Sequence, residues 1–235
     1  MWPFGRRTSS KVVSAFGQTL SSYPLDAQGV PAALGEMRGR LFDMEGHTIE
    51  GIFRVSPSAT DLQTNRQHAE AGQVAKIHDM ARLAHIIKLW FRECLHRVNI
   101  KPPNPQNCLC GNQRLGLPCT PAVLHIGELP ESLFKPCLQS IVDGPPRDAA
   151  ACAALVQEMP EPNRSTALWL CTLLQDIARH EDSNRMTHKS LSIVFAPNVV
   201  DPPQSMPPML ALELNHRVVA FLERLLEAGS HADAM

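Results

Sequence analysis

The stretch from Asn163 to His180 has the sequence NRSTALWLCTLLQDIARH and decides the fold class. Apolar residues recur in it every three or four positions, which is the spacing of one face of an α-helix. They are Leu168, Cys171, Leu174, Ile177 and Ala178. A half-buried strand would instead alternate apolar and polar residues with a period of two. The stretch therefore predicts a long amphipathic helix.

The same periodicity extends over much of the remaining chain, interrupted by prolines. Thr187 is expected to cap a helix over residues 191–195, and Pro197 to end it. Further helices are predicted over residues 32–42, 58–71, 77–93, 133–141 and 210–225, with another that stops at Pro160. No stretch shows a convincing strand period. The sequence thus predicts an all-α, single-domain helical bundle.

Composition limits the classes of protein that need to be considered. A length of 235 residues fits one large domain, and a hydrophobic share of 44% is ample for a core. The formal charge of -1 gives no bulk attraction to nucleic acid. No apolar run approaches the roughly 20 residues that would span a bilayer. Seven cysteines without a disulfide pattern indicate a reducing compartment. We expect a cytoplasmic protein that a partner could recruit to membranes.

Both ends of the chain and one internal segment differ from the helical pattern. Residues 1–15 are expected to form a flexible basic arm, with a mitochondrial targeting segment as the alternative. Residues 230–235 are expected to form a C-terminal tail. Cys94–Glu128 contains five prolines and four cysteines without helical periodicity, which predicts a long irregular insertion. It is either a genuine loop or sequence that the mature transcript lacks, such as a retained intron.

The insertion also raises the question of a metal site. Its candidate ligands are Cys94, His96, Cys108, Cys110, Cys119 and His125. They lack a paired Cys-x-x-Cys spacing, so a structural zinc site is not the favoured interpretation. A second constellation, His78-Asp79 with His85, lacks the full ligand set of a metal-dependent phosphohydrolase. We expect no metal and no cofactor.

Arg54 is the candidate catalytic residue. It lies between apolar residues and a turn-prone Ser56-Pro57 pair. A planar guanidinium presented in this way is suited to stabilising charge on a phosphoryl group. No phosphate-binding loop motif is visible in the chain itself. The phosphate is therefore expected to belong to a partner, with the arginine supplied in trans.

Four blocks of sequence, in order, resemble the Rho GTPase-activating (RhoGAP) domain. The blocks are Glu50–Ser56 (EGIFRVS), Ile87–Glu93 (IKLWFRE) continued by Leu129–Leu133 (LPESL), Asn184–Thr187 (NRMT) and Leu191–Asn198 (LSIVFAPN). Removing Cys94–Glu128 joins the two parts of the second block. The similarity extends over about residues 16–226, so we expect a RhoGAP-like domain over residues 16–229.

This resemblance implies a helical bundle that docks on Rho, Rac or Cdc42-type GTPases and accelerates hydrolysis of their bound GTP. It implies that Arg54 is the catalytic arginine finger. Lys88 and Arg92 match positions that contact the GTPase or brace the finger loop, and Asn198 matches an asparagine that hydrogen-bonds at the interface. The chain would then be an activator of its GTP-bound partner and not itself an enzyme. The alternative is a catalytically silent docking module with the same fold.

Overall fold

The computed structural model describes residues 16–18, 20–96, 133–134, 137–144, 148–200, 202 and 206–232. Within these ranges the chain is helical and has no β-strand, which confirms the all-α prediction. The α-helices are α1 (Ala32–Asp43), α2 (Ala59–Glu70), α3 (Met80–His96), α4 (Leu138–Asp143), α5 (Ala149–Gln157), α6 (Asn163–Ala178), α7 (Glu181–Asn184), α8 (His188–Val199) and α9 (Pro208–Ala232). Short 3₁₀ turns occupy Leu20–Ser22, Gly46–Thr48 and Val74–Lys76.

Parts of the sequence-based domain division lie outside the described residues. These parts are the basic arm at 1–15, residues 97–128 of the insertion and the last three residues of the tail. Four of the candidate zinc ligands fall there as well, namely Cys108, Cys110, Cys119 and His125. The insertion and the domain boundaries therefore stay predictions.

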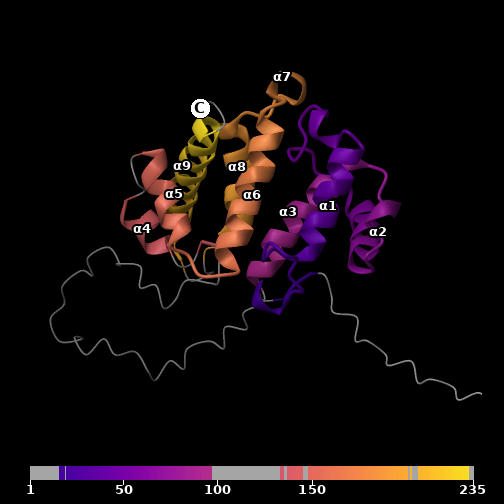
Figure 1. Ribbon diagram of the computed structural model, residues 1–235, viewed down its shortest axis with the longest axis horizontal. Helices are drawn as coiled ribbons and strands as arrows, with labels where there is room; N and C mark the ends of the chain where they lie inside the picture. The colour runs from indigo at the N-terminus through magenta and orange to yellow at the C-terminus, as the bar shows by residue number, and fades with distance from the viewer. Residues whose placement is uncertain are drawn as a thin grey trace, which may run out of the picture.

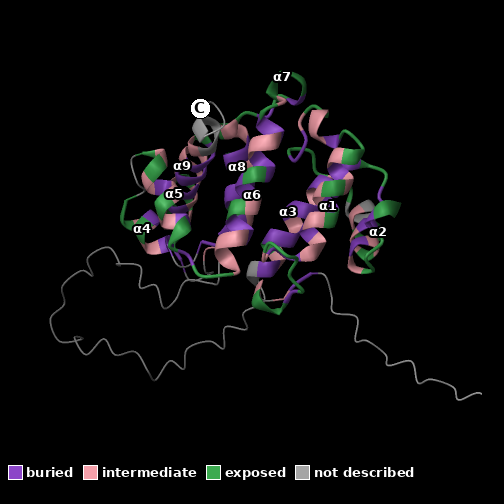
Figure 2. Ribbon diagram, in the orientation of Figure 1, coloured by how far each residue is buried: buried purple, intermediate pink, exposed green. Residues whose placement is uncertain are grey.

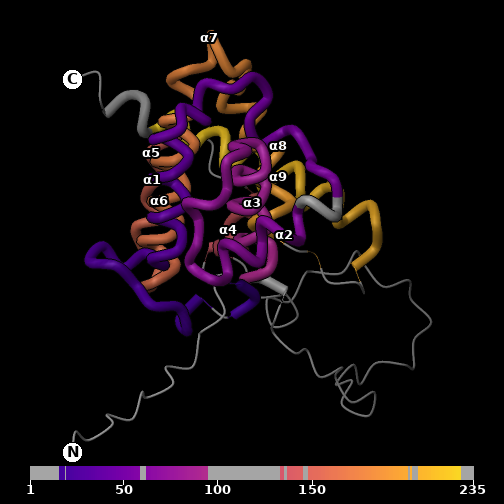
Figure 3. Tube along the Cα trace, turned by 90° about the vertical axis from the view of Figure 1, so that its right-hand side faces the viewer, coloured from indigo at the N-terminus to yellow at the C-terminus, as the bar shows by residue number. Residues whose placement is uncertain are grey.

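The helices form a bundle with α6 and α8 in its middle (Figure 1). Helices α1, α2 and α3 lie on one side of this pair, and α4, α5 and α9 lie on the other. The short helix α7 projects at one end of the bundle in both Figure 1 and the turned view of Figure 3. Among the described helices, none is long and apolar enough to cross a membrane.

Helix α6 shows how the apolar period produces the core. Its buried face consists of Ala167, Leu170, Cys171, Leu174, Ile177 and Ala178, together with Thr166 and Leu173. Leu168, which the sequence placed on this face, is exposed instead, because the stripe runs through Ala167 one position earlier. Burial along the helices is strongest on the sides that face one another (Figure 2). Each buried leucine or isoleucine side chain of this face contributes about 1.5–3 kcal/mol to stability.

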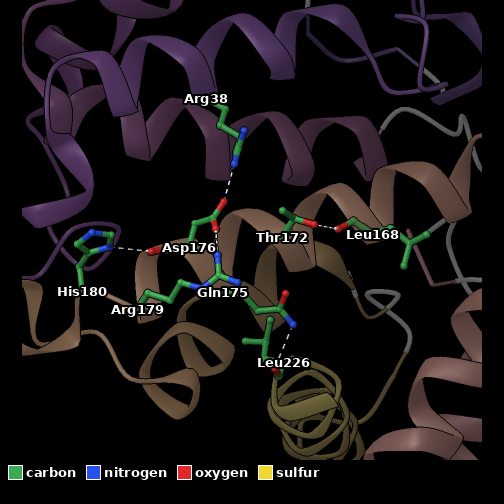
Figure 4. Close-up of polar contacts among 8 residues, drawn as sticks. All are labelled: Arg38, Leu168, Thr172, Gln175, Asp176, Arg179, His180 and Leu226. Atoms are coloured by element: carbon green, nitrogen blue, oxygen red, sulfur yellow. Dashed lines mark hydrogen bonds and ion pairs between the residues drawn. The ribbon is translucent and has the colours of Figure 1, made fainter. Parts of the chain in front are cut away.

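Polar links supplement the apolar contacts between helices (Figure 4). The Nη2 atom of Arg38 in α1 lies 2.5 Å from Oδ2 of Asp176 in α6. Asp176 also accepts a hydrogen bond from Arg179, three residues later. On another side of α6, Gln175 Nε2 donates to the carbonyl of Leu226 in α9, at 3.0 Å. Helix α6 is therefore joined to helices on both sides of the bundle.

Helices α3 and α8 end later than the sequence predicts. Helix α3 continues to His96, three residues into the segment expected to be irregular, because Cys94 is buried one turn after Trp90 and Phe91. Helix α8 runs to Val199 through Pro197, which was expected to end it. Pro197 lies in the last turn, so the missing N–H affects only the carbonyl of Ile193, an exposed residue.

The short helix α4 also differs from its prediction. It covers Leu138–Asp143, whereas Leu133 and Phe134 form a turn before it. Both turn residues are nevertheless buried, and the Phe134 ring meets Phe221 of α9 edge to face with 5.4 Å between centroids. The apolar pattern thus identified core residues correctly but assigned them to the wrong local structure.

Candidate functional site

Arg54 lies at the end of a tight turn after the 3₁₀ segment Gly46–Thr48. The Arg54 N–H donates to the carbonyl of Gly51 at 2.8 Å. Gly51 and Phe53 both have left-handed backbone conformations, with φ of 69° and 70°. Glycine adopts this conformation readily, whereas it is uncommon for an aromatic residue. A turn of this shape therefore depends on contacts from the surrounding structure.

The apolar residues of the turn point into the core and leave Arg54 at the surface. Ile52 is fully buried and Phe53 is 1% exposed, whereas Arg54 is exposed. The Phe53 ring meets the Phe195 ring of α8 edge to face, with centroids 5.1 Å apart. The burial of the consecutive Ile52 and Phe53 therefore fixes the turn, and the guanidinium that follows is presented to solvent.

Two hydrogen bonds join the backbone of the turn to other elements of the fold. The Lys88 ammonium group, in α3, donates to the carbonyl oxygen of Phe53. The Gly51 N–H donates to the carbonyl of Asn184, at the end of α7, at 2.8 Å. The turn is therefore attached to two elements that are far from it in sequence.

Lys88 is buried, at 8% exposure. This burial lowers the pKa of the Lys88 ammonium group from its usual value. A charged group is tolerated in such a place when it is hydrogen-bonded, and here the partner is the residue directly before Arg54. The sequence left two roles open for Lys88, which were to contact a partner or to brace the turn that carries Arg54. The buried position and the bond to the Phe53 carbonyl fit the bracing role.

The Arg54 side chain forms a single, weak hydrogen bond among the described residues. Its Nη2 atom lies 3.5 Å from Oγ of Ser190 in the first turn of α8. This is the long limit of a hydrogen bond, so the guanidinium can leave Ser190 at little cost. The sequence did not single out Ser190. Its position three residues after the capping Thr187 was the available signal, because it places the hydroxyl in the first turn of a helix.

Asn198 lies two helical turns beyond Ser190 in α8, about 12 Å along the axis at 1.5 Å per residue. Its Nδ2 atom donates to the carbonyl of Val194 in the same helix, at 2.7 Å. The structure therefore brings Lys88 and Ser190 to the arginine turn and leaves the Asn198 amide bonded within its own helix. The interfacial role expected of Asn198 stays a prediction.

Arg92 lies one turn after Lys88 in α3 but is exposed. Both residues follow His85 on the same helix. Burial lowers the pKa of the His85 imidazole, and the positive charges of Lys88 and Arg92 lower it further. The next residue, Glu93, accepts two hydrogen bonds from Arg66 of α2, at 2.5 and 2.7 Å. Arg92 is thus an exposed cation, whereas Lys88, on the same helix, is buried.

Exposed apolar side chains lie next to the polar residues of the site in sequence. Val55, directly after Arg54, is 50% exposed. Ile193, three residues after Ser190 in α8, is 52% exposed.

The described residues contain no group of three or more histidine, cysteine, aspartate or glutamate side chains placed to hold a metal ion. Asp79, from the second metal constellation, instead caps the start of α3. Its Oδ1 atom accepts a hydrogen bond from the Arg82 N–H at 3.2 Å, and its Oδ2 atom lies 3.0 Å from Arg82 Nε.

The fold and the site define an all-α domain that exposes an arginine on a turn, and buried Lys88 and the Asn184 carbonyl hold the backbone of that turn. The family model described as RhoGAP domain matches residues 126–204. The matched segment contains Asn184, Ser190 and Asn198, whereas Arg54 and Lys88 precede it.

Similar proteins extend the likeness to the first part of the chain. Rho GTPase-activating protein gacA of Dictyostelium discoideum is 29% identical over 197 residues, covering 84% of this chain and 47% of that protein. Rho GTPase-activating protein 5 of Arabidopsis thaliana is 26% identical over 226 residues, covering 94% and 56%. The chain thus spans about half the length of these relatives. The crystal structure of human Rho GTPase activating protein 15 shares the fold, with a TM-score of 0.61 at 21% identity, covering 93% of this chain and 90% of that one.

The resemblance to the RhoGAP domain family predicted from the four sequence blocks is confirmed.

Proposed function

We propose that the chain activates a Rho-family small GTPase, and that Arg54 is the residue it inserts into the partner's nucleotide site. The partner is the GTP-bound form, since only that form holds the phosphoryl group to be transferred to water. The names of the similar proteins support this class of activity. The chain completes the active site of the GTPase and performs no reaction alone.

The observation that carries the proposal is the contrast between the Arg54 side chain and its backbone. The guanidinium is exposed, and its only hydrogen bond among the described residues is to Ser190 Oγ, at 3.5 Å. The backbone of the turn is held by Lys88 and by the Asn184 carbonyl. A preorganised turn lowers the entropy cost of placing the guanidinium in a partner's site. The Arg54 side chain can therefore change its conformation, whereas the Arg54 backbone is held in place.

The chemistry follows from the charge that develops on the transferred phosphoryl oxygens. A guanidinium donates two parallel hydrogen bonds and stays charged, and a trans arginine accelerates hydrolysis by about 10³ to 10⁵. Since each tenfold in rate is about 1.4 kcal/mol, Arg54 would stabilise the transition state by roughly 4 to 7 kcal/mol. The exposed Val55 and Ile193 would help to exclude water around it.

The test is a GTP hydrolysis assay against a panel of Rho, Rac and Cdc42-type proteins. Arg54→Ala is expected to lower the stimulated rate constant by at least about a hundredfold, while the half-saturating concentration changes only a few-fold. Arg54→Lys should recover little of the loss, because lysine lacks the planar fork. Arg164→Ala, at the opposite end of α6 from α7, is the control and should behave like the parent.

Two results would contradict the proposal in different ways. An Arg54→Ala protein that stimulates as well as the parent would show that hydrolysis does not depend on this arginine. A parent that binds GTPases of the panel without stimulating any of them would favour the silent docking module.

A further inference from the structure

We propose that Asn184 is a positioning residue for Arg54, because its buried carboxamide holds in place the backbone to which the arginine turn is bonded. Asn184 belongs to the block Asn184–Thr187 that resembles the RhoGAP family, but the sequence did not indicate this role. The effect on hydrolysis rests on the proposed function, whereas the effect on the turn can be measured in the chain alone.

The Asn184 side chain is completely buried, and its hydrogen-bonding groups are satisfied by backbone from three parts of the chain. Nδ2 donates to the carbonyl of His47 at 2.8 Å and to the carbonyl of Ile177 at 2.7 Å. Oδ1 accepts from the Met186 N–H at 2.8 Å. Both amide donors and an acceptor position are thus used.

These bonds join segments that are distant in the chain. His47 belongs to the 3₁₀ turn just before the arginine turn, Ile177 lies in the last turn of α6, and Met186 leads into α8. Arg185, with φ of 59°, turns the chain sharply between Asn184 and Met186. One side chain therefore fixes the backbone at the point where α6, α7 and α8 meet the arginine turn.

The main chain of Asn184 is hydrogen-bonded to the arginine turn. Its carbonyl accepts the Gly51 N–H at 2.8 Å, and the Gly51 carbonyl in turn accepts the Arg54 N–H at 2.8 Å. Two consecutive hydrogen bonds thus connect the buried carboxamide residue with the backbone of Arg54. Lys88 holds the other side of the turn through the Phe53 carbonyl, so Asn184 supplies a second, independent attachment.

Other residue types could not make the same set of bonds. Aspartate would place a carboxylate oxygen against the two carbonyl oxygens of His47 and Ile177 and would lack both donors. Alanine would leave those carbonyls and the Met186 N–H without their partner in a buried place. Serine keeps a hydroxyl that can satisfy only part of the set. The turn should loosen in each case, although the Asn184 carbonyl itself remains.

The first measurement needs no variant. Amide hydrogen exchange of the full chain should give similar protection factors for Gly51 and Met186, because both N–H groups are bonded to Asn184 and should open together. A Gly51 amide that exchanges far faster than Met186 would show that the turn moves independently of Asn184, and it would overturn the inference whatever any variant does.

The second measurement compares Asn184→Ala and Asn184→Ser with Val156→Ala. Val156 is a fully buried residue of α5, so this control loses stability without touching the arginine turn. We expect the stimulated rate constant of Asn184→Ala to fall by about tenfold or more, with the half-saturating concentration changed only a few-fold. Exchange at Gly51 should accelerate more than exchange in α9. Val156→Ala, assayed where it is equally folded, should show neither effect.

The outcomes separate this inference from the proposed function. If the parent stimulates hydrolysis and folded Asn184 variants match Val156→Ala in rate and in Gly51 exchange, Asn184 is not a positioning residue. If Asn184→Ala does not fold, the milder Asn184→Ser variant and the parental comparison of Gly51 with Met186 decide. If the parent stimulates no GTPase, the proposed function fails, and the exchange measurements alone decide the role of Asn184.

Discussion

The peptide group between Phe53 and Arg54 is held on both of its sides. Its carbonyl oxygen accepts a hydrogen bond from buried Lys88, and its N–H donates to the Gly51 carbonyl. A peptide group is planar and rigid, so these two bonds fix the orientation from which the Arg54 side chain departs. Buried Lys88 therefore fixes the geometry of the turn, whereas exposed Arg54 is the cation proposed for catalysis.

Lys88→Met should separate the role of the buried charge from that of the buried volume. Methionine fills a similar space but cannot donate to the Phe53 carbonyl, so the stimulated rate constant should fall about tenfold or more. The melting temperature should change little, because the relieved desolvation cost of the buried charge is offset by the loss of the donor to the Phe53 carbonyl. Hydrolysis assays and thermal unfolding of the same preparations would measure both.

The control for this change is Lys76→Met, which removes an exposed lysine from a 3₁₀ turn before α3. It should leave both quantities unchanged. If Lys88→Met lost stability as strongly as it lost activity, the lysine would be a general structural residue and its bond to Phe53 would have no special part in presenting Arg54.

Only part of the site could be predicted from the sequence. Arg54 and Lys88 stood out because a cation in an apolar run and a basic pair on one helix face are local patterns, strengthened by the family resemblance. Asn184 and Ser190 could not be assigned roles in this way, because their partners are 137 and 136 residues away, at His47 and Arg54. Such contacts depend on how the helices pack, which no local spacing contains.

At the scale of elements, the apolar period predicted the long helices well. Helix α1 begins and ends within one residue of its prediction and buries the expected Leu34, Met37 and Leu41. The period could not predict α7, since this four-residue helix is mostly polar and is held by Asn184. Local rules also failed at Pro197. The buried Phe195, Ala196 and Val199 keep the last turn of α8 helical although proline disfavours it.

The start of α8 follows its predicted rule and offers a test of it. Oγ1 of Thr187 accepts a hydrogen bond from the Ser190 N–H at 3.2 Å, as expected of a capping residue. Thr187→Ala should cost about 1 kcal/mol. For a domain of this size the melting temperature should fall by roughly 2–4 °C. Thermal unfolding monitored by circular dichroism would measure the shift.

A matched substitution in α6 provides the comparison. Thr172 is exposed, and its hydroxyl donates to the Leu168 carbonyl within the helix. Because alanine is the better helix former in such a position, Thr172→Ala should not lower the melting temperature. Equal losses for the two variants would mean that the Thr187 cap contributes nothing specific to α8.

At the scale of the whole molecule, the bundle unites the chain on both sides of residues 97–132. Helix α3, before that gap in the described residues, contacts α8, which follows it. Phe91 and Phe195 meet across this contact with ring centroids 6.4 Å apart. Any shortened chain that removes the predicted insertion should therefore begin the deletion after His96, because Cys94 is part of the core.

A cluster of rings between α1, the turn before the site and the end of α6 should make stability depend on pH. His47 stacks on Phe42 with centroids 4.7 Å apart and meets His180 edge to face at 4.5 Å. Burial, and then the charge of His180, lower the pKa of His47, while Glu45 and Asp176 oppose this. Both histidines cannot be charged cheaply at this distance. The cluster favours neutral His47.

The sign of the pH effect follows from proton counting. The pKa of His47 is lower in the folded chain than its unfolded value of about 6.5, so the unfolded chain binds more protons below that pH. Stability is therefore complete above about pH 6.5 and is lost as the pH falls through the folded pKa. The lowered pKa of His85 acts in the same direction.

His47→Phe should flatten this dependence, since phenylalanine can keep the stacking on Phe42 and cannot take up a proton. We expect the melting temperature of the parent to fall between about pH 7.5 and 5.5, and that of His47→Phe to fall less, with the remainder due to His85 and the carboxylates. Thermal unfolding across this range would measure both slopes. His216→Gln, at an exposed position on α9, should keep the parental slope. A parental slope in His47→Phe would show that the ring cluster does not control the acid sensitivity of the fold, and the loss would then have to come from groups outside it.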